Sequence, residues 1–385
     1  MKINKAHLLY AFFFFICLKP FGINYYNILD NAMNVAKIIM FAYYFLFYCI
    51  SICTGKIKRF KCTNILILLY LAVTIPTIVY NGDYFRRIME MASTVMLSIF
   101  IEKNKKDIGD ILTSWFWVIT LYMPINLLSI ASGAVAFEES MAIYFLGSKN
   151  TWGSLLPIYC FIIYYVYQKN NKTKKYAQFA LILMAANVIV TRSTTAMVEL
   201  VILAFFWLLK DKKLIRKISG YWLLLSIYAA LNLALLSSAW WGNIIGYLDA
   251  YFSKGSFSFT ARTRMWQAGI DLFLSHPLFG VGKLTEKVWT SNILGVGYHT
   301  QLHNQIVEYL ATGGLCLFGI YVVLLILAGK NLQKYHVQGI AYFMIISIFL
   351  QNIGVLTEAK YFAEFYVLFI LSFYIEFLLA DRKKV

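Results

Sequence analysis

Four side chains that could bind an anion or transfer a proton lie in a few polar stretches of an otherwise apolar chain. Arg262 and Arg264 fall in the stretch TARTRMWQAGIDLFLSHPLFGVG, Arg192 falls in TRSTTA, and His303 opens HNQIVEYL. Arginine suits phosphate because its planar fork makes bidentate hydrogen bonds and keeps its charge. Histidine accepts and returns protons near neutral pH. Together these residues predict an extracytoplasmic site for a substrate that carries phosphate.

Each of these residue types also has a purely structural interpretation. An arginine at a membrane boundary often snorkels toward the headgroups, and for Arg264 both interpretations stay open. An interfacial histidine such as His276 is more often a solvated loop residue. Glu90 and Glu199, inside apolar stretches, are either substrate contacts or buried carboxyl groups.

The composition of the chain predicts the elements that must position these residues. Of 385 residues, 61% are hydrophobic and 14% are charged, and the mean hydropathy is +0.67, whereas soluble domains carry roughly 25% charged residues. The sequence therefore predicts an all-α, polytopic membrane protein, because each spanning helix satisfies its own backbone in lipid. Twelve spans are predicted: Leu8–Ile23, Ala32–Cys53, Thr63–Tyr80, Ile88–Ile101, Ile111–Ile130, Trp152–Tyr167, Tyr176–Val190, Thr195–Leu209, Tyr221–Ala239, Gln305–Ala328, Gly339–Leu356 and Phe362–Leu379.

The basic residues predict the orientation of these spans. Most of the 35 Lys and Arg fall in the two termini and in alternate loops, which places both termini in the cytoplasm. This topology and the anionic lipid headgroups account for the net charge of +17 without a nucleic acid. None of the six cysteines falls in the large external loop, and no Cys/His spacing predicts a metal site. We expect no cofactor.

The chain divides into three parts by the length of its loops. Residues 1–239 carry the first nine predicted spans, residues 240–303 form one large external loop, and residues 304–385 carry the last three. The long loop contains four tryptophans, so it is predicted to fold as a small cap on the outer face rather than to be disordered.

One helix is predicted within that loop. Arg262, Trp266, Ile270 and Phe273 recur at helical spacing, so one face is apolar with Arg262 at its N-terminal end. Pro277 then ends the helix, and the glycines that follow it provide a turn.

At this point the residues show a family resemblance. The stretch ARTRMWQAGIDLFLSHPLFGVG, followed by HNQIVEYLATGGLCLFG, resembles the C-terminal signature of the O-antigen ligase and O-antigen polymerase superfamily. Two weaker matches lie upstream, in GSKNTWGSLLP and VTRSTTAMVEL. The resemblance implies a metal-independent, inverting glycosyltransferase whose fold is similar to that of the C-type glycosyltransferases. Its donor is a glycan linked through diphosphate to undecaprenol.

Carried over by motif, the resemblance also implies residue roles. Arg262 and Arg192 would hold the diphosphate, and His303 would be the base that activates the acceptor hydroxyl. Glu308 would either orient the His303 ring or be structural. The residues implied to bind substrate are Arg264, Asn304, Glu308, Trp266, Lys149 and Asn150.

The resemblance leaves the acceptor open. A polymerase moves the growing chain onto the next lipid-linked repeat unit, whereas a ligase moves the polymer onto lipid A core. The abundance of Lys, Ile, Asn, Tyr and Phe favours the polymerase, because such chains are common among surface-polysaccharide clusters. A lipid-linked oligosaccharide flippase or exporter is the second alternative, but no pseudo-symmetric halves are evident. The implied surroundings are the bacterial plasma (inner) membrane, a chain-length regulator and a flippase.

Overall fold

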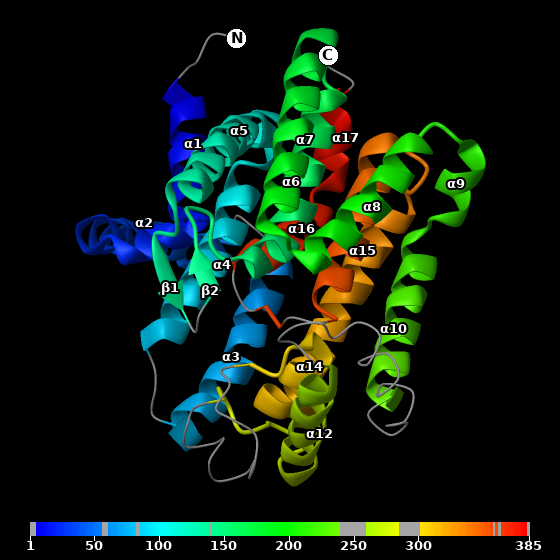
Figure 1. Ribbon diagram of the computed structural model, residues 1–385. Helices are drawn as coiled ribbons and strands as arrows, with labels where there is room; N and C mark the ends of the chain where they lie inside the picture. Colours follow the sequence, from blue (N-terminus) through cyan, green and yellow to red (C-terminus); the bar gives the residue numbers. More distant parts are fainter. Residues whose placement is uncertain are drawn as a thin grey trace.

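The computed structural model describes residues 5–55, 61–81, 85–138, 141–238, 259–284, 301–356, 359–360 and 363–382, and it is almost entirely helical (Figure 1). The longer helices are α1 (Lys5–Cys17), α2 (Asn27–Cys53), α3 (Lys61–Asn81), α4 (Phe85–Lys103), α5 (Ile108–Ser132), α6 (Trp152–Tyr167), α7 (Asn171–Thr191), α8 (Thr194–Leu208), α9 (Lys213–Ile218), α10 (Tyr221–Ser238), α12 (Phe259–Ser275), α14 (Gln305–Gln333), α15 (Gly339–Gly354), α16 (Ala363–Ser372) and α17 (Ile375–Arg382). The all-α prediction is confirmed.

Every predicted span overlaps a helix or, for the last one, the bent pair α16 and α17. The first span was predicted too long: α1 ends at Cys17, before Pro20, and Phe21–Tyr25 form a separate 3-10 helix. By length and hydropathy, four of the helices among the described residues can each cross a membrane: Asn27–Cys53, Lys61–Tyr80, Lys105–Ser132 and Gln305–Gln333. The pair α16 and α17, bent by 70°, adds a fifth if it is one span. Several of the remaining apolar helices are shorter, so the number of twelve spans stays a prediction.

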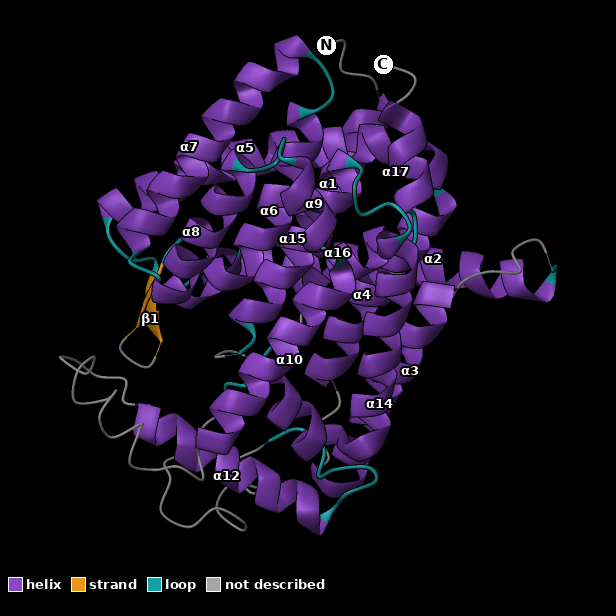
Figure 2. Ribbon diagram, turned by 90° about the vertical axis from the view of Figure 1, so that its right-hand side faces the viewer, coloured by secondary structure: helices purple, strands orange, loops and turns teal. Residues whose placement is uncertain are grey.

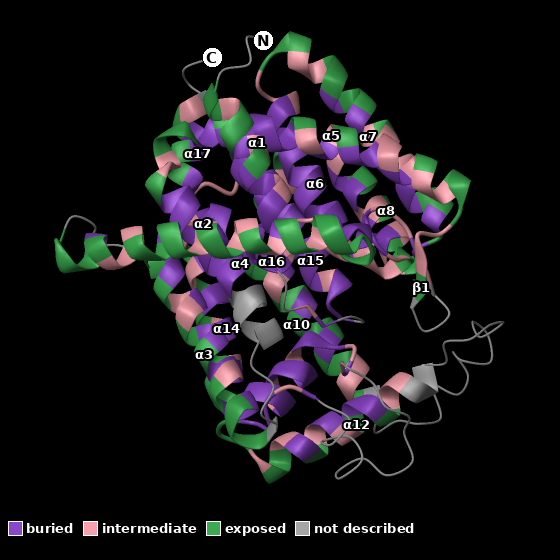
Figure 3. Cartoon of the chain, turned by 90° about the vertical axis from the view of Figure 1, so that its left-hand side faces the viewer, coloured by how far each residue is buried: buried purple, intermediate pink, exposed green. Residues whose placement is uncertain are grey.

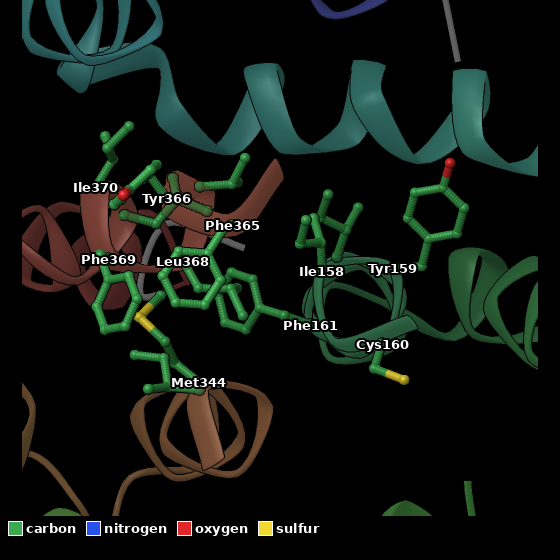
Figure 4. Packing of buried hydrophobic residues seen from close by; sticks show 14 of the residues in the cluster. Ile158, Tyr159, Cys160, Phe161, Met344, Phe365, Tyr366, Leu368, Phe369 and Ile370 are labelled. Carbon is green, nitrogen blue, oxygen red and sulfur yellow. The ribbon is translucent and has the colours of Figure 1, made fainter. Parts of the chain in front are cut away.

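The central core is formed by α6, α15 and α16. In α6 nearly every side chain is buried, since the helix is apolar on all its faces and is surrounded by others. Phe161 of α6 and Met344 of α15 meet Phe365 and Leu368 of α16, while Cys160 points away from that contact (Figure 4). This core holds α6 and α15 in place, and both helices carry glycines that matter at the site below.

Helix α2 is arranged differently from its neighbours. It lies across the other helices and extends beyond them (Figure 3), and its buried residues are only Met33, Tyr44 and Ser51. Many of its other side chains are exposed, among them the apolar Val35, Ile39 and Leu46.

A short hairpin interrupts the helices between α5 and α6. Strands β1 (Ala136–Glu138) and β2 (Met141–Ile143) pair antiparallel, and Figure 2 shows them in orange at the left edge of the molecule. The chain that follows is tied to α5, because the Leu146 N–H donates to Oδ1 of Asn126 at 2.8 Å. This hairpin was not predicted. It fixes the approach to the short helix η3 (Lys149–Thr151), which leads into α6.

The two chain termini and helix α12 lie at opposite ends of the molecule. Helix α1 begins and α17 ends at one end, and α12 lies at the opposite end (Figure 1). We therefore expect reporter fusions at Lys172 and Lys213 to read cytoplasmic and a fusion at Ser256 to read external, as the basic loops predict. Ser256 lies outside the described residues. Fusions to alkaline phosphatase and to green fluorescent protein at each position report on which side of the membrane it lies. A cytoplasmic signal at Ser256 would contradict the predicted orientation.

Candidate active site

Helix α12 presents its two arginines on different faces. Met265, Trp266 and Leu272 are buried, and Arg262 is half-buried one turn before the first two of them. Arg264 is exposed. Because residues three and four apart share a helix face, Arg262 extends the buried stripe, whereas Arg264 lies on the solvent side. The buried stripe is centred on Met265 and Trp266 rather than on the predicted Ile270 and Phe273, which are only half-buried.

The buried stripe of α12 packs against the start of α14. Trp266 is fully buried in a small core with Leu302, Val307 and Ala311. The helices approach closely at Gly269, where a Cβ atom would stand 2.5 Å from Cγ1 of Val307. The structure therefore places Trp266 in the packing that joins the helix of Arg262 to the helix that follows His303.

The turn after α12 pairs with the Gly-rich part of α14. The Val281 N–H donates to the Ala311 carbonyl at 2.9 Å, and the Gly282 N–H donates to the Thr312 carbonyl at 2.9 Å. In the other direction, the Leu315 N–H donates to the Pro277 carbonyl at 2.8 Å. The two stretches PLFGVG and ATGGLC thus form one hydrogen-bonded unit, although 28 residues lie between them in the sequence.

Glycines make this close pairing possible. Gly280 and Gly282 have φ of 64° and 76°, and Gly314 interrupts the helical conformation of α14 with φ of 60°. A Cβ atom on Gly280 would stand 2.5 Å from the backbone N of Gly313. The predicted end of the helix and its glycine turn are confirmed, and their partner is the Gly-rich step of α14.

We expect Gly280→Ala to lower the melting temperature of the purified protein by several degrees and to reduce activity. The substitution adds about 1–2 kcal/mol of backbone strain at positive φ and a steric overlap with backbone that cannot move aside. Gly319→Ala is the control, because a Cβ atom there meets nothing within 4 Å. The melting temperature of each variant is measured in detergent by size-exclusion chromatography after heating. Equal melting temperatures of Gly280→Ala and Gly319→Ala would show that this pairing does not stabilise the protein.

His303 is held between two anchored residues. Oδ1 of Asn304 accepts from the N–H groups of Ile306 and Val307 at 3.0 and 3.1 Å, which caps α14. Its Nδ2 donates to Oδ1 of Asn232 at 3.0 Å and to the Leu356 carbonyl at 3.2 Å. An amide side chain makes four such bonds at most, so this buried Asn304 side chain uses its full capacity inside the protein.

On the other side of His303, Glu308 fixes the backbone. Its Oε2 accepts from the Leu302 N–H at 2.7 Å, and the residue is 1% exposed. Glu308 therefore helps to position His303 by fixing Leu302, the residue directly before it. His303 itself is half-buried and has φ of 54°.

Arg192 occupies a similar backbone conformation at the turn between α7 and α8. Its φ is 52°, it ends α7, and it is exposed. Ser193 then caps α8 by accepting from the Ala196 N–H at 3.4 Å. In the described parts of the chain, Arg192 and His303 are the only residues other than glycine with positive φ. Such conformations cost about 1–3 kcal/mol and cluster at functional sites.

Close helix contacts bring the elements of these residues together. A Cβ atom on Gly153 of α6 would lie 3.5 Å from Cγ2 of Thr195 on α8, and one on Gly354 of α15 would lie 2.9 Å from the Gly153 carbonyl oxygen. The Gln305 N–H donates to the Val355 carbonyl at 3.1 Å, which joins α15 to the start of α14. The start of α6, the start of α8, the start of α14 and the end of α15 therefore meet.

Lys149 and Asn150 lie on η3, one turn before this meeting point; Lys149 is exposed and Asn150 is half-buried. Other parts of the predicted loop, including Trp240, Trp241 and Trp289, lie outside the described residues. Sequence reasoning missed Gln305 and Lys360, which are joined by side-chain hydrogen bonds described below. The one available signal was a glutamine in the first turn of an apolar helix directly after His-Asn.

Comparison with known proteins assigns the segment that carries the main site residues. Residues 179–322 match the family model described as O-antigen ligase. The match begins within α7 and ends within α14, so it includes Arg192, Arg262 and His303, while Lys149 and Asn150 lie before it. No curated protein matches the chain.

Proposed function

Since this chain belongs to the O-antigen ligase and polymerase superfamily, we propose that it is a polysaccharide repeat-unit polymerase. It transfers the growing glycan from undecaprenyl diphosphate onto the next lipid-linked repeat unit, at the outer face of the bacterial plasma membrane. The observation that carries the proposal is the shared strained backbone of Arg192 and His303. The family motifs single out these two residues, and the backbone geometry singles them out independently.

The proposed reaction needs one base and a cationic site for the leaving group. Neutral His303 accepts the proton of the acceptor hydroxyl while its oxygen attacks the anomeric carbon of the donor. The bond from that carbon to the diphosphate breaks, and the diphosphate leaves with the electron pair. Arg262 and Arg192 stabilise the charge that develops there. Attack opposite to the leaving group inverts the anomeric configuration, and the chemistry requires no metal ion or cofactor.

The remaining predicted residues support this arrangement in two ways. We assign Asn304, Glu308 and Trp266 to positioning, because their side chains are buried and pack or bond within the protein. Arg264, Lys149 and Asn150 are proposed substrate contacts at the rim, since Arg264 and Lys149 are exposed and Asn150 is half-buried.

The ligase reaction is the second candidate, because the description of the matched family names a ligase. Deletion of the gene separates the two reactions. A polymerase deletion removes long chains but leaves single repeat units attached to the core. A ligase deletion instead leaves polymer on undecaprenyl diphosphate. Loss of every externally exposed repeat unit would favour the flippase alternative and contradict both transferases.

A further inference from the structure

Lys360 is tied to the start of α14 by the side chain of one buried residue. Oε1 of Gln305 accepts from the Lys360 N–H at 2.7 Å, and Nε2 of Gln305 donates to the Lys360 carbonyl at 3.0 Å. Gln305 is fully buried and lies two residues after His303. Two bonds to one amide fix the backbone of Lys360 relative to the proposed base.

The charged end of Lys360 is available for a ligand. The residue is half-buried, and its ammonium group makes no hydrogen bond or ion pair with any residue that the structure describes. The backbone of Lys360 is thus fixed, while its half-buried ammonium group stays accessible. The Lys360 ammonium group can therefore bind an anionic ligand without breaking a hydrogen bond to any residue that the structure describes.

Glu199 of α8 is the second unpaired group here. It is fully buried, and neither of its carboxylate oxygens has a hydrogen-bond partner among the described residues. Oε1 stands 2.5 Å from the position of a Cβ atom on Gly354, so the carboxylate lies against the end of α15. Among the described residues, Lys360 is the cation whose charge acts on the Glu199 carboxylate. Burying an unpaired carboxylate is costly. The nearby positive charge of Lys360 offsets part of that cost for Glu199.

The two groups connect the elements that carry the proposed catalytic residues. Glu199 is seven residues, about two helical turns, after Arg192, and the backbone of Lys360 is bonded two residues after His303. Lys360 is thus anchored at the His303 segment and attracted electrostatically toward α8, which begins two residues after Arg192.

We propose that Lys360 is a third cation of the diphosphate-binding site and that Glu199 is its positioning residue. This inference rests on the proposed function. A lysine binds phosphate as a mobile point charge, unlike the bidentate arginine. The ammonium group turns toward Glu199 when the site is empty and toward the diphosphate when the donor binds. Glu199 limits where the flexible side chain can go without itself touching the anionic substrate.

The test is steady-state elongation by the purified full-length protein with undecaprenyl-diphosphate repeat units, together with inhibition by inorganic diphosphate. Loss of one charge-assisted contact is expected to raise KM and weaken diphosphate inhibition about 10-fold or more in Lys360→Gln. The turnover number should change much less. Lys360→Arg should recover most of the loss. Lys334→Gln is the control, because Lys334 lies exposed at the opposite end of α14, and its KM should be unchanged.

Glu199→Gln separates positioning from a merely structural role. We expect it to raise KM in the same direction, and the double variant Lys360→Gln/Glu199→Gln to be no worse than Lys360→Gln alone, because coupled residues are not additive. Additive effects, or an unchanged KM in Glu199→Gln, would overturn the positioning role even if Lys360→Gln failed to fold. A wild-type KM in Lys360→Gln while Arg262→Ala is inactive would sink this inference alone. Wild-type elongation by Arg262→Ala and His303→Ala as well would instead sink the proposed function.

Discussion

Replacing His303 by alanine is expected to lower the elongation rate about 10²-fold or more, because general-base assistance typically contributes 10²- to 10⁴-fold. Donor binding should survive, since the cations rather than the base hold the diphosphate. In vitro elongation by the purified protein, resolved on a gel, measures the rate. Binding of the undecaprenyl-diphosphate donor is measured in parallel on the same preparation.

A second substitution separates the loss of the base from a change of backbone. His303 has φ of 54°, a conformation that asparagine tolerates better than alanine does. His303→Asn therefore keeps the left-handed turn but removes the base, and we expect it to be as slow as His303→Ala. His276→Ala is the matched control, because the His276 ring packs edge-on against the Tyr80 ring and is hydrogen-bonded to Oγ of Ser275. Full-rate elongation by His303→Asn would exclude His303 as the base, whereas loss of both binding and expression would indicate a structural role.

Replacing Arg262 by alanine is expected to abolish elongation, and replacing it by lysine to recover little. A point charge cannot reproduce the two parallel hydrogen bonds that a guanidinium group makes to a phosphate. Removing such an electrostatic stabiliser of the transition state costs about 10²- to 10³-fold in turnover. The length distribution of the polymer in a complemented deletion strain gives a first measurement, and turnover by purified protein gives the second.

Arg264 is the internal control for this experiment. It lies two residues away on the same helix but on the exposed face, so Arg264→Lys and Arg264→Ala should both be milder than the matching changes at Arg262. Near wild-type chain length in Arg262→Lys would show that Arg262 does not bind phosphate. If the two arginines exchanged these phenotypes, the face of α12 that turns toward the substrate would be the opposite one.

Several features of the protein follow from short stretches of sequence. The apolar segments predicted the helices, since a chain in lipid must satisfy its backbone within each segment. The end of α12 at Ser275 and the turn at Gly280 and Gly282 followed from proline and glycine nearby in the sequence. The recognition of the family also needed only local residues. These features are set by interactions that reach about one helical turn along the chain.

Other features depend on contacts between segments far apart in the sequence. Periodicity placed Arg262 on an apolar face, but only packing on α14 distinguished it from Arg264. The family resemblance implied that Asn304 binds substrate and left the role of Glu308 open, whereas the structure shows their side chains bonded to Asn232, Leu356 and Leu302.

The pairing of PLFGVG with ATGGLC, the clamp of Gln305 on Lys360 and the placement of Glu199 against Gly354 were likewise invisible in the sequence. A one-dimensional pattern records which residues share a helix face, but not which other helix that face meets. The close glycine contacts at Gly153 and Gly354 make that choice, because helices approach closely only where small residues leave room. Tertiary packing therefore determined which polar groups became neighbours at the site.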